Sequence, residues 1–327
     1  MTDGALLDVQ GLSVRFAMPR RSPFGERLHL EAVRDVSFSL RPGRTLGLVG
    51  ESGSGKTTTA MAAIRLKPAH AGAVLFEGID LLGLDAEEMR QRRRHLQVIF
   101  QDPYSSLNPR QRVGAIVREP LDLMVADEPA SRRDDRVREL FGLVGLRLDQ
   151  MALFPHQFSG GQRQRISIAR ALATRPRLIV CDEPVSALDV AIQAQILNLL
   201  RRLQESHGLS YLFISHDLGV VQFICDDIAV MYLGQIVEHA DRPALFSRPR
   251  HPYTAALLAA APSLARRKSA GYVREAVVRG DPPSPVNIPH GCAFASRCPH
   301  TQPRCREERP LLRADAGGAV ACHYPLG

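Results

Sequence analysis

Tryptophan is absent from the 327-residue sequence, and aromatic residues together make up only 6% of it. The sequence also lacks any uninterrupted apolar run approaching the ~20 residues that a membrane-spanning helix needs. Residues 1–4 are not part of a basic segment followed by an apolar core, so we expect no secretory signal. These absences argue against a membrane-embedded or secreted protein. The composition, 45% hydrophobic and 23% charged, is instead ordinary for a folded soluble protein of one large domain with an appendage, or of two domains.

Acidic residues are in deficit, because 42 Lys and Arg stand against 34 Asp and Glu, which gives a net charge of +8. A net positive charge of this kind is typical of proteins that bind nucleic acid or anionic lipid. An arginine-rich composition gives the same balance without either partner, so both interpretations stay open. The six cysteines are expected to be reduced in the cytoplasm unless they bind metal. Of these, Cys181 and Cys225 are interpreted as small core residues.

Apolar patterning divides the chain into expected strands and helices. Strands are predicted over 6–15, 33–40, 46–49, 73–76, 96–100, 178–181, 211–215, 228–232 and 235–239. Helices are predicted over 58–66, 87–95, 131–144, 163–173 and 190–205, with 110–175 mainly helical. Residues 17–30 are expected to form an irregular insertion. After about residue 241 prolines and arginines become frequent, which predicts a separate C-terminal module over 241–327.

A glycine-rich segment, Gly-Glu-Ser-Gly-Ser-Gly-Lys-Thr, runs from Gly50 to Thr57 between a predicted strand and a predicted helix. That context is what a phosphate-binding loop requires. The glycines allow backbone N–H groups to turn inward around an anion, and the helix N-terminus adds partial positive charge. Lys56 would reach the β- and γ-phosphates, and the Thr57 hydroxyl would ligate Mg²⁺. The segment therefore predicts nucleotide binding.

Two carboxylates follow the apolar run 178–181, which is typical of a parallel strand buried on both faces. Asp182 at the end of such a strand would hold Mg²⁺ through water, and Glu183 could polarise the attacking water.

A second pair of glycines stands in Ser159-Gly160-Gly161-Gln162, at the start of a predicted helix. Ser159 and Gln162 have the spacing of a capping box. Adjacent glycines also expose N–H groups at a helix start, which is a second anion site. Two such sites about a hundred residues apart indicate that the second serves another phosphate, on a partner chain.

The order of these motifs resembles the ATP-binding subunit of ABC transporters over roughly residues 5–240. The resemblance rests on Gly50–Thr57, Gln101, Ser159–Gln162, Asp182-Glu183, Ser186–Asp189 and His216. It implies an α/β fold of the P-loop NTPase class: a RecA-like core, an antiparallel β subdomain and a helical subdomain at about 102–175. The expected domains are therefore 1–240 for the ATPase and 241–327 for the C-terminal module.

The resemblance also implies roles for individual residues. Two such chains would pair head to tail, with each ATP between one phosphate loop and the other chain's Ser159–Gln162 motif. The implied catalytic residues are Glu183, His216 and Gln101, and the implied Mg²⁺ ligands are Thr57, Gln101 and Asp182. Among the implied ATP-binding residues, Phe16 would stack on adenine and Asp189 would couple the two sites. The others are Gly50, Glu51, Ser52, Gly53, Ser54, Gly55, Lys56, Thr57, Thr58, Ser159, Gly160, Gly161 and Gln162.

Further segments resemble the oligopeptide/dipeptide importer ATPases, in particular 100–110, 251–258 and the Pro-Pro-Ser-Pro stretch at 282–285. The form with Tyr104 and Arg110 is similar to the second of the two ATPase subunits. The resemblance implies a heterodimer with a sibling ATPase, two transmembrane permease subunits, an extracytoplasmic substrate-binding protein, and a peripheral place on the cytoplasmic face of the inner membrane. It further implies that ATP hydrolysis by this chain powers the import of di- and oligopeptides, with nickel or another small solute as the alternative cargo. A soluble ABC ATPase acting on nucleic acid or the ribosome is the rival class, but the chain lacks the coiled-coil insertion or second phosphate loop usual there.

Four cysteines, Cys292, Cys298, Cys305 and Cys322, lie in the C-terminal module with five, six and sixteen intervening residues. This spacing fits neither a zinc ribbon nor a ferredoxin pattern. The segment around Cys292 and Cys298 resembles the C-terminal domain of these importers, some of which carry a four-iron, four-sulfur cluster. A 4Fe–4S cluster is therefore expected, with Zn²⁺ and metal-free thiols as the alternatives.

Overall fold

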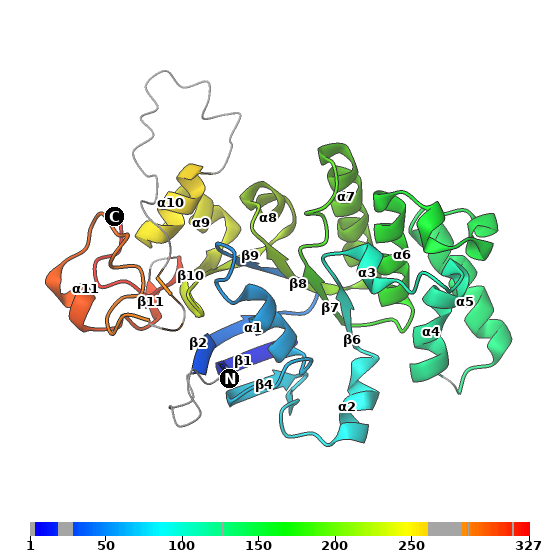
Figure 1. The fold of residues 1–327 in the computed structure, drawn as a ribbon, viewed down its shortest axis with the longest axis horizontal. Coiled ribbons are helices and arrows are strands. Elements are labelled where there is room, and N and C mark those ends of the chain that lie inside the picture. Colours follow the sequence, from blue (N-terminus) through cyan, green and yellow to red (C-terminus); the bar gives the residue numbers. More distant parts are fainter. Residues whose placement is uncertain are drawn as a thin grey trace.

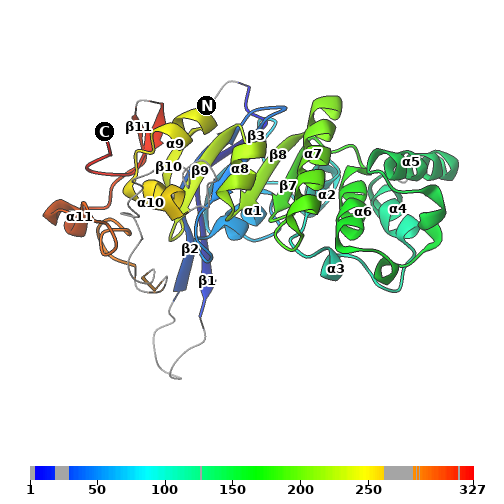
Figure 2. The same cartoon turned by 90° about the horizontal axis from the view of Figure 1, so that it is seen from above.

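The computed structural model describes residues 4–18, 29–125, 127–260, 283–284, 286, 288–315 and 317–327. Two sheets organise these residues, one of eight strands in the order β11-β12-β10-β9-β3-β8-β7-β6 and one of four in the order β2-β1-β4-β5. Figures 1 and 2 show the helices α4, α5 and α6 at one end of the molecule and the C-terminal segment at the other.

The centre of the larger sheet is parallel, because β3 pairs in parallel with β8 and β9, and β7 pairs in parallel with β6 and β8. These strands are β3 (Thr45–Val49), β6 (Leu96–Ile99), β7 (Leu178–Asp182), β8 (Ser210–Ser215) and β9 (Asp227–Tyr232). In β8, Tyr211 and Phe213 enter one apolar core while Leu212 and Ile214 enter the other. Strands buried on both faces in this way appear in sequence as the continuous apolar runs noted above.

Helices cover the sheet and complete both cores. They are α1 (Lys56–Ala63), α2 (Ala86–Arg93), α7 (Val190–His207), α8 (Leu218–Ile224), α9 (Arg242–Ser247) and α10 (Pro252–Ala260). The predicted amphipathic helix over 190–205 is confirmed as α7, whose buried residues Ile196, Leu199, Leu200 and Leu203 share one face. Among the described residues, no helix combines the length and the apolar character needed to cross a membrane.

The smaller sheet is antiparallel and lies below the larger sheet in Figure 1. It contains β1 (Leu7–Ala17), β2 (His29–Leu40), β4 (Ala71–Phe76) and β5 (Ile79–Asp80). The expected insertion over 17–30 is too wide, because Ala17 pairs with His29 and Phe16 with Leu30. Pairing across the hairpin continues both strands past the point where alternation in the sequence ends. Residues 19–28 lie outside the described residues.

The helical region projects from the edge strand β6. It comprises α3 (Pro103–Ser106), α4 (Val113–Met124), α5 (Ala130–Leu143), the short helices η1 (Leu148–Ala152) and η2 (Pro155–Gln157), and α6 (Gly160–Leu172). Val117 and Leu121 of α4 and Leu140 of α5 are buried in the same cluster as Ile168 of α6. The expectation of mainly helical structure over 110–175 is confirmed.

The C-terminal segment joins the larger sheet instead of standing apart from it. Strand β10 (Gln235–Asp241) pairs with β9 on one side and with β12 (Gly318–Val320) on the other, and β12 pairs with β11 (Arg313–Asp315). A short helix, α11 (Pro303–Glu307), precedes β11 and β12 in the chain. The domain boundary at residue 240 stays a prediction, but the sheet hydrogen bonds run across it.

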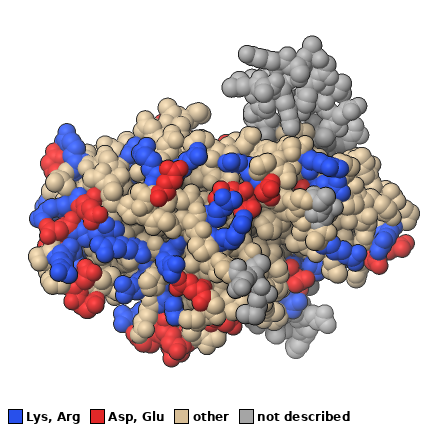
Figure 3. All heavy atoms as spheres, turned by 180° about the vertical axis from the view of Figure 1, so that it is seen from behind, with Lys and Arg blue, Asp and Glu red and all other residues tan. Residues whose placement is uncertain are grey.

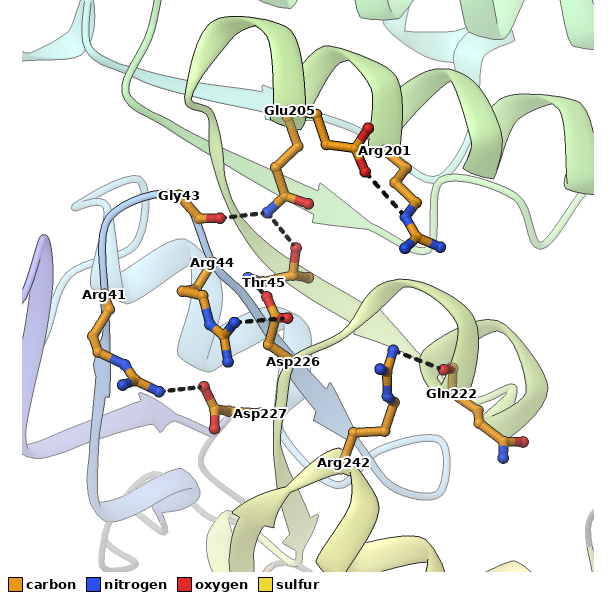
Figure 4. Close-up of polar contacts among 11 residues, drawn as sticks. Arg41, Gly43, Arg44, Thr45, Arg201, Glu205, Gln222, Asp226, Asp227 and Arg242 are labelled. Carbon is orange, nitrogen blue, oxygen red and sulfur yellow. Dashed lines mark hydrogen bonds and ion pairs between the residues drawn. The ribbon is translucent and has the colours of Figure 1, made fainter.

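Polar contacts tie together the ends of the strands that lie away from the glycine loop (Figure 4). Arg44, before β3, forms an ion pair with Asp226, before β9, at 3.3 Å, and the amide of Gln204 donates to Gly43 O and Thr45 Oγ1. Asp226 also accepts a hydrogen bond from the backbone N–H of Thr45. These contacts join the start of β3 to the start of β9 and to α7.

Candidate nucleotide site

The loop from Gly50 to Gly55 connects β3 to α1, as the sequence predicts. Two of its glycines leave no room for a side chain: a Cβ at Gly50 would lie 2.2 Å from Met231 O, and one at Gly55 would lie 2.4 Å from Ala32 O. Gly55 also has a φ of 99°, in the region that favours glycine. The backbone can therefore approach β9 and β2 this closely only with glycine at both positions.

Lys56 is buried, with 5% of its surface exposed, and its ammonium group lies within the loop. Lys56 Nζ donates to Gly50 O at 2.9 Å and to Glu51 O at 2.8 Å. Burial lowers the pKa of Lys56, while the carboxylates of Glu183, Asp182 and Glu51 act in the opposite direction. A cation held inside a loop at a helix N-terminus gives the loop the charge that a phosphate needs.

Thr57 and Asp182 are brought together from segments 125 residues apart. Thr57 Oγ1 donates to Asp182 Oδ1 at 2.8 Å, where α1 begins and β7 ends. Burial raises the pKa of Asp182, and the hydrogen bond from Thr57 partly offsets this. A hydroxyl beside one carboxylate is the donor set that Mg²⁺ uses when phosphates supply further ligands. These two residues therefore fit a magnesium ion bound with a nucleotide.

Glu183 is the centre of a second group of residues. Its carboxylate accepts a hydrogen bond from Gln101 Nε2 at 3.1 Å and lies 3.1 Å from His216 Nδ1. The backbone of Glu183 has a positive φ of 46°, and its N–H donates to Ile214 O of the neighbouring strand. Gln101, Glu183 and His216, predicted as catalytic residues, thus lie together.

An open cleft of about 650 Å³ contains these groups. The cleft is lined by Phe16 and Ala32 of the antiparallel sheet and by Gln101, Glu183 and His216. Residues lining the cleft from the loop and α1 are Ser52, Gly53, Gly55, Lys56, Thr57 and Thr58. The ring of Phe16 is half-buried, and Lys67 Nζ lies 5.4 Å from its centroid. The cleft therefore has an aromatic wall next to a phosphate cradle.

The described residues that line this cleft do not include any residue of the Ser159–Gln162 motif. Ser159 caps α6 by accepting from the backbone N–H of Gln162, and the Gln162 side chain accepts from Ser159 N–H. Gly161 is required by packing, since a Cβ there would lie 2.5 Å from Ile192 Cγ2 of α7. The predicted capping box is confirmed, and Asp189 caps α7 in turn through Ile192 N–H. The predicted contacts of Ser159, Gly160 and Gly161 with a nucleotide on a partner chain, and the predicted coupling role of Asp189, stay predictions.

Sequence reasoning did not anticipate the C-terminal contacts to Glu51. Its backbone N–H donates to Tyr253 Oη at 2.9 Å, and its carboxylate pairs with Arg297. The separations of 202 and 246 residues leave no local pattern from which these contacts could be predicted.

The four C-terminal cysteines line one small cavity together with His251, His300 and His323. As they stand, no three Cys, His, Asp or Glu within the described parts of the chain are arranged to hold a metal ion. The expected iron–sulfur cluster and its zinc alternative stay predictions. Burial raises the pKa of Cys292 to about 11 and also raises the pKa values of Cys298 and Cys322. Cys181 and Cys225 are fully buried, as expected for core residues.

The parallel sheet, the glycine loop, the buried lysine and the Thr57–Asp182 pair together define a P-loop nucleoside triphosphatase. Residues 33–186 match the family model described as "ABC transporter". Residues 237–305 match a second model, "Oligopeptide/dipeptide transporter, C-terminal region".

Curated relatives match nearly the whole chain. A putative peptide import ATP-binding protein of Brucella ovis is 47% identical over 313 residues, covering 96% of this chain and 95% of the relative. The oligopeptide transport ATP-binding protein AppF of Bacillus subtilis is 48% identical over 297 residues, with 90% and 89% covered. A probable peptide ABC transporter ATP-binding protein of Sinorhizobium fredii is 51% identical over 299 residues, with 90% and 82% covered.

Solved structures give the same result for the fold. The dimeric post-hydrolysis state of the ATP-binding cassette MJ0796 bound to ADP and Pi has a TM-score of 0.64 at 27% identity, covering 72% of this chain and 98% of the other. The chain therefore belongs to the family of ATP-binding subunits of ABC transporters, and it is an ATPase of that type.

Proposed function

We propose that this chain hydrolyses ATP to drive import of di- and oligopeptides across the cytoplasmic membrane. The observation that supports the cargo most directly is the match of residues 237–305 to the oligopeptide/dipeptide C-terminal model. Relatives named for peptide import match both this region and the ATPase. Nickel or another small solute is the alternative cargo, because permeases and binding proteins select what an importer carries.

For the reaction, we propose that Lys56 and the N–H groups of the loop hold the β- and γ-phosphates. Thr57 and Asp182 would hold Mg²⁺, which supplies charge neutralisation at those phosphates. Glu183 accepts the proton of the attacking water, a role that requires a carboxylate facing the γ-phosphate position. Gln101 and His216 fix the direction of that carboxylate through their contacts at 3.1 Å. The His216 side chain lines the cleft and is more than half exposed to solvent, so it can contact the γ-phosphate itself.

The site is proposed to be completed by a second ATPase subunit, whose Ser159–Gln162 equivalent covers the γ-phosphate. Two features support this. The N–H groups at the start of α6 lie at an exposed end of the helix, and Ser159 and Asp189 are exposed beside it. By the same proposal, the sibling's phosphate loop receives Ser159, Gly160 and Gly161 of this chain, and Asp189 couples the two sites.

Two permease subunits are the proposed membrane partners, and we place their contact at the surface next to Gln101. Phe100 and Tyr104 flank Gln101 and Asp102 with exposed fractions of 40% and 58%. A groove of about 330 Å³, lined in part by Phe100, Leu123 and Met124, continues from there between β6 and α4. An apolar helix of a permease at this groove would place the chain peripherally at the cytoplasmic face of the membrane, with the binding protein on the far side.

The rival function, action on nucleic acid, is not favoured by the charge distribution on the face drawn in Figure 3. Lys and Arg side chains alternate there with Asp and Glu instead of forming one continuous basic surface. Several of the arginines are paired, as in Arg118 with Asp122 and Asp134 and Arg138 with Asp135.

The experiment is uptake of labelled peptides into proteoliposomes that contain this chain, its sibling, the permeases and the binding protein. We expect ATP-dependent uptake of peptide that is lost with Glu183→Gln. ATP-dependent uptake of Ni²⁺ without peptide uptake would replace the cargo and keep the ATPase. Retention on nucleic acid without any dependence on permeases would favour the rival class.

We also propose that Cys292, Cys298, Cys305 and Cys322 bind a 4Fe–4S cluster, with one Zn²⁺ as the alternative. The support is chemical: the four thiols line one cavity, and Cys292, Cys298 and Cys305 lie in the segment that matches the importers' C-terminal region. Thiolate ligation requires these thiols to lose their protons and move closer together. Iron, sulfide and zinc analysis of protein purified without oxygen tests this. Iron and sulfide near four per chain would support the cluster, and one zinc per chain would support the alternative. Protein without either metal would show that the four cysteines are free thiols.

A further inference from the structure

Glu51, the second residue of the phosphate loop, is held from two sides by the C-terminal segment. Arg297 donates from Nη1 to Glu51 Oε2 at 2.9 Å and from Nη2 to Glu51 Oε1 at 3.1 Å. This is a bidentate pair, the strongest geometry between a guanidinium and a carboxylate. Tyr253 of α10 accepts the backbone N–H of Glu51 at 2.9 Å. Both the charge and the backbone of residue 51 are thus fixed by residues beyond 250.

Arg297 is itself held in place by packing. Only 7% of its side chain is exposed, and its guanidinium lies 5.8 Å from the ring centroid of Tyr232. Tyr232, Tyr253 and Phe294 form an aromatic cluster with centroids 4.6 to 5.4 Å apart. Rings at these distances and tilts attract one another. The segment that carries Arg297 therefore cannot move away from the loop without breaking this cluster.

The pair matters for the nucleotide because Glu51 carries a negative charge in the loop that is to bind phosphates. Glu51 O accepts a hydrogen bond from Lys56 Nζ, as Gly50 O does, so residue 51 helps to position the ammonium group. Without Arg297, the carboxylate would be free to turn towards the cleft. There it would repel the phosphates and compete for Lys56.

We propose that Arg297 is a positioning residue of the ATP site, through which the C-terminal segment sets the affinity of the phosphate loop for nucleotide. Its guanidinium neutralises Glu51 and orients it away from the phosphates, and Tyr253 fixes the backbone beside it. This inference rests on the ATPase assignment and does not depend on the cargo.

The test measures binding of a fluorescent ATP analogue, and KM and kcat for ATP, in the full chain with Arg297→Ala. We expect the dissociation constant and KM to rise roughly tenfold, as for the loss of one charge-assisted contact, while kcat at saturating ATP changes little. Arg297→Lys keeps the charge without the fork and is expected to restore part of the affinity.

The double variant Glu51→Gln with Arg297→Ala separates electrostatic positioning from damage to the fold. If Arg297 acts by neutralising Glu51, removing the carboxylate recovers most of the affinity lost in Arg297→Ala. The matched control is Arg44→Ala, which breaks an ion pair with Asp226 at the opposite end of β3 (Figure 4) and is expected to leave affinity unchanged.

An unchanged dissociation constant and KM in Arg297→Ala would overturn the proposal. So would a loss of affinity that Glu51→Gln does not recover, because a merely structural role gives that pattern. Failure of the wild-type chain to bind the analogue would instead refute the ATPase assignment, so the two failures are distinguishable.

Discussion

Replacing Glu183 by Gln tests whether this carboxylate is the catalytic base. The change removes one proton acceptor and leaves a side chain of the same shape. The glutamine carbonyl can still accept from Gln101 Nε2, which lies 3.1 Å from the present carboxylate. The phosphate loop, Lys56 and the Thr57–Asp182 pair are untouched. Nucleotide affinity is therefore expected to remain, and only the chemical step is expected to slow.

The magnitude follows from the role of a general base, which contributes roughly 10²- to 10⁴-fold to a rate. That loss corresponds to about 3 to 5 kcal/mol in the barrier. Turnover is measured as phosphate release at saturating Mg²⁺ and ATP, and affinity as binding of the fluorescent analogue. If this chain pairs with a sibling ATPase as proposed and hydrolysis separates the pair, ATP should also trap the variant as a closed dimer in size-exclusion chromatography.

Glu205→Gln is the matched control, because it makes the same chemical change in an ion pair with Arg201 on α7 (Figure 4). That pair is exposed to solvent, and its loss is expected to leave turnover within error of the wild type. Near-normal phosphate release by Glu183→Gln would refute the assignment of Glu183 as the base. A parallel loss in nucleotide affinity would show that Glu183 binds nucleotide instead of acting on water.

Three further perturbations test other parts of the site. Lys56→Ala removes the buried ammonium group that faces the phosphates, so we expect loss of tight nucleotide binding in the fluorescence titration; unchanged affinity would contradict the loop assignment. Gly55→Ala places a Cβ 2.4 Å from Ala32 O at a φ of 99°, and we expect about 3 kcal/mol of destabilisation, seen as a lower midpoint in thermal unfolding. Burial lowers the pKa of His251 to about 3, so the unfolded chain takes up a proton near pH 6.5 that the folded chain does not. His251 therefore contributes stability above pH 6.5 that is lost by about 1.4 kcal/mol per pH unit as pH falls towards 3, and His251→Gln is expected to flatten this part of the unfolding curve measured against pH.

The sequence predicted those parts of the site whose signals are local. The phosphate loop, with Lys56 and Thr57, is contiguous, and Asp182 and Glu183 directly follow a strand that burial on both faces makes apolar. Such segments carry their own structural context. The proximity of Glu183 to Gln101 and His216 followed from the family resemblance, since no spacing in the sequence places three separate strand ends at one point.

The rest could not be predicted because it depends on contacts between distant segments. Strands β1 and β2 extend to Ala17 and from His29 because backbone hydrogen bonds across the hairpin stabilise residues whose side chains show no alternation. In the same way, β12 joins the sheet beside β10 through backbone pairing, which any side chains can accept. The ion pair between Glu51 and Arg297 joins two charged residues that are far apart in the sequence, and nothing in the sequence indicates that they form a pair.

The order of the strands explains why these distant segments meet at one site. In the sheet, β3 lies between β9 and β8, and β8 lies beside β7. The carboxyl ends of these parallel strands therefore lie along one edge, where ligands of such sheets bind. The phosphate loop follows β3, Asp182 and Glu183 stand at the end of β7, and His216 follows β8. Tyr232 ends β9 at the same edge and packs against Phe294, so the C-terminal segment is brought within reach of Glu51 by the same topology that assembles the ATP site.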